Sequence, residues 1–198
     1  MVLALLLALL PLVQERTTIK ETHPDGSAKA EYEVVAGENA ETVIDGAYRA
    51  WNPAGQLIAE GQYDRGYRTG EWKLFHEDGS LESEGSYLED ERHGPWKTYF
   101  ASGAVRSEGK YERGFKSGRW SFWDEEGKKD KRNSGKYEIA RDRLDDGGST
   151  TSAEKSGKKH GRWIRRDANG AILEEGYFTT DKRSGEWVKY WPGTTTNT

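Results

Sequence analysis

Residues 70–118 read GEWKLFHEDGSLESEGSYLEDERHGPWKTYFASGAVRSEGKYERGFKSG, which is one 24-residue pattern stated twice. Each copy opens with Gly, followed by Trp two places on, a second aromatic residue three further, Gly at nine, an apolar residue at eleven, and then Glu-Gly-x-Tyr. The pattern extends upstream and downstream of this stretch. Its opening glycines are Gly46, Gly70, Gly94, Gly118, Gly161 and Gly185. Self-similarity at a fixed period of this length indicates a repeat array.

Each unit carries an x-Gly dipeptide that predicts a two-residue β-hairpin turn, because such turns require residues that tolerate positive φ. With Asp78-Gly79 as that turn, Trp72 lies opposite Gly85, Leu74 opposite Ser83 and His76 opposite Leu81. The same register pairs Tyr48 with Gly61, Trp96 with Gly109 and Trp163 with Gly176. A ring can cover the backbone that a strand glycine leaves bare. We therefore expect each ring to lie over the glycine opposite it.

Alternation along the strands defines two faces. The better-buried face is expected to carry the structural residues Tyr48, Trp72, Trp96, Trp120, Trp163 and Trp187, with Gly61, Gly85, Gly109 and Gly176. The opposite face carries a second aromatic row among mostly charged neighbours: Trp51, Phe75, Tyr99, Trp123 and Tyr190. Successive hairpins should join through turns that place Gly or Asp four residues before the opening glycine: Gly66, Asp90, Gly114, Gly157 and Asp181.

The chain divides by how well it follows the pattern. Residues 1–14 contain an apolar run of about 18 Å as a helix. This is too short for a bilayer and typical of a signal peptide, with a short anchor or a misassigned start as alternatives. Residues 15–45 form a divergent first repeat, 46–127 and 161–192 regular repeats, and 193–198 a polar tail. Residues 128–160 read as a degenerate repeat.

The degenerate repeat departs from the pattern at particular positions. Lys129 stands where a leucine belongs, Asn133 is the expected partner of Trp120, and Tyr137 arrives two residues late. Residues 145–148, DDGG, can still turn a short hairpin. We expect this segment to be the least stable part of the array, with a mobile tip.

Composition restricts the function. The chain has no cysteine, which excludes disulfides, thiol catalysis and Cys-ligated metals. Its formal charge is −4 and its basic residues are interleaved with acidic ones, so we expect no nucleic-acid partner. The four histidines are isolated, and no nucleophile–base set or metal-ligand cluster is recognisable. We expect neither enzymatic activity nor a cofactor.

Two sets of residues are candidates for binding. A basic residue stands two places before the opening glycine in five units: Arg68, Arg92, Lys116, Lys159 and Arg183. This column could meet anionic headgroups, or it could merely keep the turns soluble and pair with nearby Glu. The second aromatic row, defined above, could anchor a protein or stack on sugars, or it could shield the second side of a one-layer sheet.

The pattern Gly-x-Trp-x-x-aromatic, then Gly, then Glu-Gly-x-Tyr with a Lys/Arg-x-Gly close, resembles the MORN repeat. It looks closest to the bacterial variant found in proteins labelled as YwqK-family antitoxins, and the resemblance covers about residues 25–191. It implies an elongated, single-layer antiparallel sheet of successive β-hairpins. Functionally, it implies a protein-binding scaffold, a membrane-associating module or an antitoxin.

These observations predict an all-β array of five to seven MORN-like hairpins, exported to the cell envelope or secreted. The expected function is a non-enzymatic scaffold that binds an unknown protein partner. The alternative is peripheral binding to an anionic membrane or cell-wall polymer. Antitoxin activity is third, because an exported protein is poorly placed to neutralise a cytoplasmic toxin.

Overall fold

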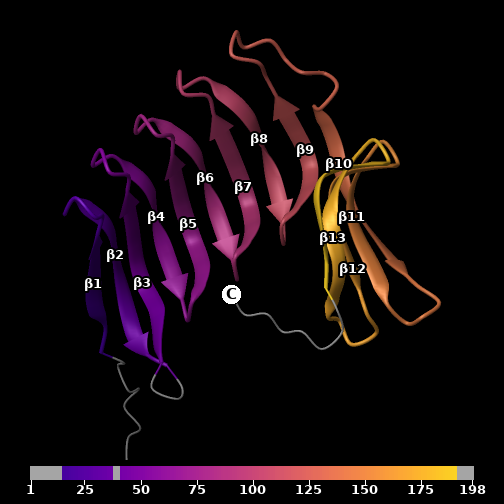
Figure 1. Ribbon diagram of the computed structural model, residues 1–198. Coiled ribbons are helices and arrows are strands. Elements are labelled where there is room, and N and C mark those ends of the chain that lie inside the picture. The colour runs from indigo at the N-terminus through magenta and orange to yellow at the C-terminus, as the bar shows by residue number, and fades with distance from the viewer. Residues whose placement is uncertain (1–14, 38–40, 191–198) are drawn as a thin grey trace, which may run out of the picture.

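The computed structural model describes residues 15–37 and 41–190, and within them the chain folds as a single open antiparallel sheet. Fourteen strands follow one another in chain order, each paired with the next (Figure 1). The all-β hairpin array expected from the repeats is confirmed, and the described residues contain no helix. The strands are β1 (Thr17–Thr22), β2 (Ala28–Ala36), β3 (Thr42–Trp51), β4 (Leu57–Asp64), β5 (Tyr67–Phe75), β6 (Leu81–Leu88), β7 (Glu91–Tyr99), β8 (Val105–Glu112), β9 (Phe115–Phe122), β10 (Gly135–Arg143), β11 (Ser149–Lys155), β12 (Lys158–Arg166), β13 (Ile172–Thr179) and β14 (Lys182–Lys189).

The turns within the units differ from the expected two-residue type. The Gly79 N–H donates to the His76 carbonyl at 2.9 Å, and the His76 N–H donates to the Ser80 carbonyl at 2.8 Å. Gly79 has φ of 83°, whereas Asp78 is not in the left-handed region and its carboxylate accepts the Ser80 N–H at 2.8 Å. This is the three-residue connection with a left-handed glycine. It corrects the end of the register, because Leu81 pairs with Phe75 and not with His76.

The turns between units lie where they were expected, and they are the two-residue turns. Leu88 pairs with Glu91, and both intervening residues, Glu89 and Asp90, have positive φ, at 52° and 65°. Positive φ at both central positions is the requirement of the type I′ turn. The same arrangement recurs at Arg65-Gly66, Arg113-Gly114, Ser156-Gly157 and Thr180-Asp181.

Each opening glycine lies in a bulge. In the β4–β5 pair, Glu60 faces Lys73 but Gln62 faces Thr69, so that Gly70 and Glu71 are extra residues on β5. A bulge disrupts the hydrogen-bond ladder locally. The Trp72 indole N–H fills the opening and donates to the Gln62 carbonyl at 3.1 Å. Two later units repeat this bond, from Trp96 to Ser86 at 2.9 Å and from Trp120 to Lys110 at 3.0 Å.

The predicted aromatic–glycine register is confirmed, but the position of the rings is not. Tyr48 pairs with Gly61, Trp72 with Gly85, Trp96 with Gly109 and Trp163 with Gly176. Four of the tryptophan rings nevertheless lie against the glycine of the preceding unit. A Cβ added to Gly61, Gly85, Gly109 or Gly176 would overlap the ring of Trp72, Trp96, Trp120 or Trp187, respectively. In the first three cases the indole N–H bonds to the carbonyl just after that glycine, which holds the ring on that side.

The core is a ladder of aromatic rings on this face. Trp72, Trp96 and Trp120 expose only 2–3% of their surface. Tyrosines from the Glu-Gly-x-Tyr positions stand edge-on between them, with Tyr87 5.2 Å from Trp96 and Tyr111 4.9 Å from Trp120. Edge-to-face contacts at such distances are favourable beyond the area they bury.

The degenerate repeat continues this core. Trp120 pairs with Gly135, which corrects the expected partner Asn133, because residues 130–134 form an additional turn held by the Asp130 carboxylate. In this unit, Gly135 and Tyr137 are therefore both displaced by two residues from the regular pattern. Tyr137 is 1% exposed and so belongs to the core. Residues 145–147 turn a hairpin between β10 and β11, as predicted. The expected low stability and mobile tip stay predictions.

The sheet does not remain straight at its C-terminal end. In Figure 1, β1–β9 follow one another as a curved row, and β10–β13 turn away from its direction. Strand β12 lies back against this row. Its Arg162 Nη1 is 3.3 Å from a Glu91 carboxylate oxygen on β7. The Arg162 guanidinium also lies 5.4 Å from the ring centroid of Phe115 on β9. The described molecule is therefore a sheet with two walls and a space between them.

Candidate binding groove

A groove of about 720 Å³ lies between the two walls. Strands β5–β9 form one wall, and β12–β14 form the other. The first wall contributes Arg68, Tyr87, Arg92, Tyr111 and Lys116; the second contributes Arg162, Glu175, Tyr177, Glu186 and Val188. The groove therefore combines aromatic, aliphatic and charged side chains from units far apart in the sequence.

Three of the five basic-column residues are on the first wall, and all five lie over aromatic rings. The shortest cation-to-centroid distances are 4.2 Å from Arg68 to Tyr87, 5.0 Å from Arg92 to Trp96, 4.5 Å from Lys116 to Phe122, 5.4 Å from Lys159 to Phe178 and 3.9 Å from Arg183 to Trp187. Cations are attracted to the negative face of such rings. The column is thus folded over the aromatic core.

The expected pairing of this column with acidic residues holds only in part. Arg68 lies 2.8 Å from Asp90, and Arg183 lies 2.9 Å from Glu174. Within residues 15–37 and 41–190, Arg92, Lys116 and Lys159 make no ion pair with a carboxylate. Two of these three, Arg92 and Lys116, line the groove.

Lys116 is the most perturbed cation of the groove. Its ammonium lies 5.0 Å from the Trp120 ring, 4.5 Å from Phe122 and 5.4 Å from Tyr137. Burial among these rings lowers the pKa of Lys116 to about 8, and the nearby charge of Arg92 lowers it further in the same direction. Loss of hydration and a like charge both disfavour the protonated form. The first wall therefore holds two cations, Arg92 and Lys116, that form no ion pair with the carboxylates lining the groove.

The second aromatic row is half-buried at all five positions and is tied to polar neighbours. The Tyr99 hydroxyl donates to Glu84 at 2.6 Å, and the Tyr190 hydroxyl donates to Glu175 at 2.7 Å. Burial, followed by this bond to Glu84, raises the pKa of Tyr99 to about 12. At the degenerate position, Lys129 pairs with Trp123, as Leu81 pairs with Phe75, and places its ammonium 5.9 Å from the ring. The row lies outside the groove, and only its neighbour Glu175 contributes to it.

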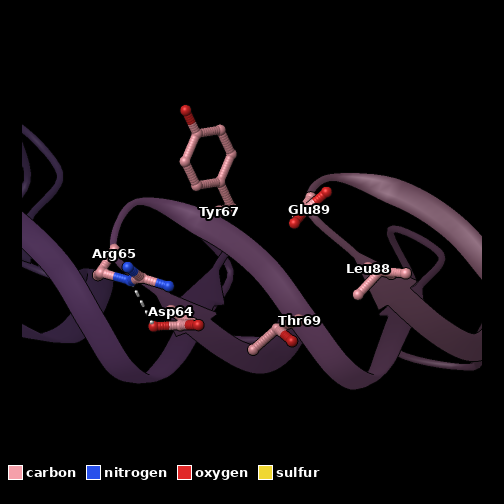
Figure 2. Close-up of a pocket in the computed structure, with 6 residues that line it drawn as sticks. All are labelled: Asp64, Arg65, Tyr67, Thr69, Leu88 and Glu89. Carbon is pink, nitrogen blue, oxygen red and sulfur yellow. Dashed lines mark hydrogen bonds and ion pairs between the residues drawn. The ribbon is translucent and has the colours of Figure 1, made fainter.

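A second hollow, of about 560 Å³, lies over the turns between units (Figure 2). Tyr67 stands away from the ribbon there, and 56% of it is exposed. Asp64 and Arg65 form an ion pair at its edge, 3.3 Å apart, and Glu89 approaches from the next turn. Because it occupies the space between successive turns of one array, this hollow follows from the repeat geometry.

The isolated histidines have structural partners. His76 Nε2 lies 3.2 Å from the Tyr99 carbonyl, and His160 stacks edge-on to the buried Tyr137. In the described part of the chain, no three His, Asp or Glu side chains gather closely enough to hold a metal ion. The same residues include no helix that could cross a membrane. The apolar run assigned to a signal peptide and the polar tail both lie outside the described residues.

The second wall of the groove was not anticipated, although the sequence carries a signal for it. Tyr177 follows the strand glycine Gly176, where other units have the polar residues Gln62, Ser86 and Lys110. Val188 stands three residues after its opening glycine, where most units have a polar residue such as Lys73, Lys97 or Ser121. Ile164 occupies the equivalent position in β12 and is 1% exposed. Apolar residues replace polar ones where the second wall meets the first.

These features define a class of protein, an all-β repeat array with a groove between its two walls and no recognisable catalytic constellation in its described residues. Residues 68–89 and 92–113 match the family model described as MORN repeat variant, so the chain contains two MORN-variant repeats. They correspond to the β5–β6 and β7–β8 hairpins. Repeats of this kind are generally associated with binding or scaffold roles. Among curated proteins, no sequence matches this chain. The YwqK-like subfamily expected from the motif is not distinguished by the match.

Proposed function

We propose that this protein is a non-enzymatic scaffold that binds a protein partner in the groove between β5–β9 and β12–β14. The main support for this proposal is that two large apolar side chains of the second wall, Tyr177 and Val188, are 54% and 44% exposed inside one groove. Scattered exposed apolar residues are ordinary, but adjacent ones rimmed by polar groups favour an interaction site. Tyrosine and arginine, both present here, are enriched among residues that dominate protein interfaces.

The groove is a better candidate than either surface considered from the sequence. Two residues of the second aromatic row, Tyr99 and Tyr190, have hydroxyls that already bond to glutamates, and the basic column lies over aromatic rings rather than projecting as a ladder. Peripheral binding to an anionic membrane or cell-wall polymer remains the second candidate, because Arg92, Lys116 and Lys159 have no acidic partner among the described residues. Export to the envelope and an antitoxin role are expectations that rest on the sequence alone.

The test is an affinity capture that compares two exposed tyrosines. The tagged full chain, a Tyr177→Ser variant and a Tyr67→Ser control are each incubated with native envelope extract and washed at low and high salt. We expect a stoichiometric protein that survives high salt, is lost with Tyr177→Ser and is retained with Tyr67→Ser. Tyr67 is as exposed as Tyr177 but lies outside the groove.

Two results would overturn this proposal. Equal capture by the two tyrosine variants would place the interface elsewhere. Capture of only anionic lipid or wall polymer, lost at high salt, would support the surface-binding candidate, because exposed charge interactions are screened by salt.

A further inference from the structure

The charges of the groove fall into a neutralised set and an unneutralised set. Arg162 lies 3.3 Å from Glu91 and 3.0 Å from Glu175, so that it satisfies the carboxylates at the junction of the two walls. Arg68 lies 2.8 Å from Asp90. The remaining carboxylate, Glu186, is exposed to solvent. These ion pairs balance three of the four carboxylates that line the groove.

The unneutralised set consists of two cations, Arg92 and Lys116. Arg92 Nη1 donates to the neutral Tyr111 hydroxyl at 3.3 Å, and its guanidinium lies over the rings of Trp96 and Tyr111. The Lys116 ammonium lies over the rings of Trp120, Phe122 and Tyr137. The two charges are close enough for Arg92 to lower the pKa of Lys116. A bound anion would relieve both the lost hydration and the like-charge repulsion.

The opposite wall determines what kind of anion fits. Tyr177 and Val188 expose apolar surface in the same groove that Arg92, Tyr111 and Lys116 line from the first wall. A bare inorganic anion would leave this surface uncovered. A peptide that carries a carboxylate beside an apolar side chain would satisfy both walls.

We propose that Arg92 and Lys116 form a carboxylate subsite, and that the partner enters the groove as a peptide segment with an acidic residue next to an aliphatic or aromatic one. This inference rests on the proposed function and specifies its ligand. The acidic side chain lies against the two cations, and the apolar side chain packs against Tyr177 and Val188. Arginine and lysine are the side chains best suited to hold a carboxylate by charge-assisted hydrogen bonds.

The experiment selects random peptides displayed on phage against the full-length protein. We expect the selected peptides to be enriched in Asp or Glu within two residues of an aliphatic or aromatic residue. One selected peptide is then synthesised together with its Glu→Gln or Asp→Asn counterpart, and both are titrated by fluorescence anisotropy. Loss of the ligand carboxylate should weaken binding about tenfold or more, since a hydrogen bond to a charged group contributes about 1.5–3 kcal/mol.

Variants assign the effect to the subsite. Arg92→Gln and Lys116→Gln should each weaken the acidic peptide about tenfold and leave the amide counterpart within about twofold. Lys159→Gln is the matched control, because Lys159 is also an unpaired cation over aromatic rings but does not line the groove. It should change neither affinity. Arg92 is exposed, so its variant reports on the subsite even if Lys116→Gln fails to fold.

The outcomes separate the subsite from the groove. If Tyr177→Ser abolishes peptide binding while Arg92→Gln and Lys116→Gln do not affect it, the groove binds protein but the carboxylate subsite is wrong. If Tyr177→Ser does not change peptide binding, both the carboxylate subsite and the proposed function are wrong. A parallel titration uses phosphatidylserine vesicles. Binding to vesicles with no peptide selected would overturn the peptide as the occupant and favour a lipid headgroup.

Discussion

Four tryptophans of the array, Trp72, Trp96, Trp120 and Trp187, each hold two units together. The Trp96 ring lies on Gly85 of the preceding hairpin, and its indole N–H bonds to the carbonyl of Ser86, at 2.9 Å. The contact is possible only because Gly85 has no side chain, since an added Cβ would overlap the ring. In a repeat protein, stability is approximately a sum over units and their nearest-neighbour interfaces. The Trp–Gly contact is the centre of that interface here.

A double-mutant cycle tests which glycine the ring covers. Trp96→Ala should cost about 3–5 kcal/mol of unfolding free energy, and Gly85→Ala about 1–3 kcal/mol because it overpacks the ring. In the double mutant, the cost of Gly85→Ala should largely disappear, giving a coupling of about 1 kcal/mol or more in urea unfolding.

The control cycle combines Trp96→Ala with Gly109→Ala. Gly109 is directly opposite Trp96 in the sheet, but the ring against it is that of Trp120. The two changes should therefore be nearly additive. Stronger coupling to Gly109 than to Gly85 would contradict the ring placement.

His160 makes stability depend on pH. Burial beside Tyr137 lowers its pKa, and the charges of Lys116, Lys155 and Arg132 lower it further. The unfolded chain therefore binds more protons than the folded one at pH values below about 6.5 and above the folded-state pKa. The stabilising contribution is complete above about pH 6.5 and is lost as the pH falls toward the folded-state pKa.

We expect His160→Gln to reduce the slope of unfolding free energy against pH below about pH 6.5. Lys155→Ala should reduce it as well, because removing one neighbouring charge raises the pKa of His160. Urea unfolding at half-unit intervals of pH gives both slopes. An unchanged slope in His160→Gln would show that other groups dominate this range.

The hairpin is the element of the array, and its two kinds of turn have different requirements. The turn within a unit needs one left-handed residue, which is Gly79 in the β5–β6 hairpin. The turn between units needs two, and in Thr180-Asp181 neither is glycine. Thr180 has φ of 51°, a conformation that is costly for a β-branched residue. Asp181 compensates in part, because its carboxylate accepts the Lys159 N–H at 2.8 Å.

Thr180→Asn should therefore stabilise the protein by about 0.5–1 kcal/mol, since asparagine tolerates the left-handed region. The matched control is Gly157→Ala, at the second position of the equivalent turn, with φ of 71°. It should destabilise by about 1 kcal/mol, because alanine does not tolerate that conformation. Thermal unfolding of both variants is the measurement, and two shifts of the same sign would be inconsistent with type I′ turns.

At the scale of the whole molecule, the return of β12 onto β7 creates the groove. Its most specific contact is Arg162 with Glu91, whose side chains are only 20% and 25% exposed. Arg162 also bonds Glu175 on β13, so one guanidinium joins the two walls. Partly buried pairs of this kind depend on geometry more than surface pairs do. The width of the groove is therefore controlled by a few side chains.

Arg162→Ala should widen the distribution of distances between the walls. The chain has no cysteine, so Tyr67→Cys and Lys182→Cys place two unique spin labels, one on β5 and one on β14. Double electron–electron resonance should give one narrow distribution for the parent and a broader, longer one for Arg162→Ala. Arg165→Ala, which removes a pair with Asp146 outside the groove, should leave the distribution unchanged. If Arg162→Ala gives the same distance distribution as the parent, packing alone holds the two walls at their separation.

By itself, the sequence determined the hairpins, their order and the aromatic–glycine register, because these follow from a local pattern repeated at a fixed spacing. It left the turn types ambiguous, since Asp78-Gly79 suits a two-residue turn as well as the three-residue connection that forms. It named Arg92 and Lys116 as candidates without their environment, and it missed Tyr177, Val188 and Arg162 as residues of one site. Only the tertiary structure decided which glycine each ring covers and where the groove lies. The physical reason is that the walls meet through contacts as distant as Arg162 and Glu91, 71 residues apart, which depend on the accumulated twist and bulges of the whole sheet and on no local signal.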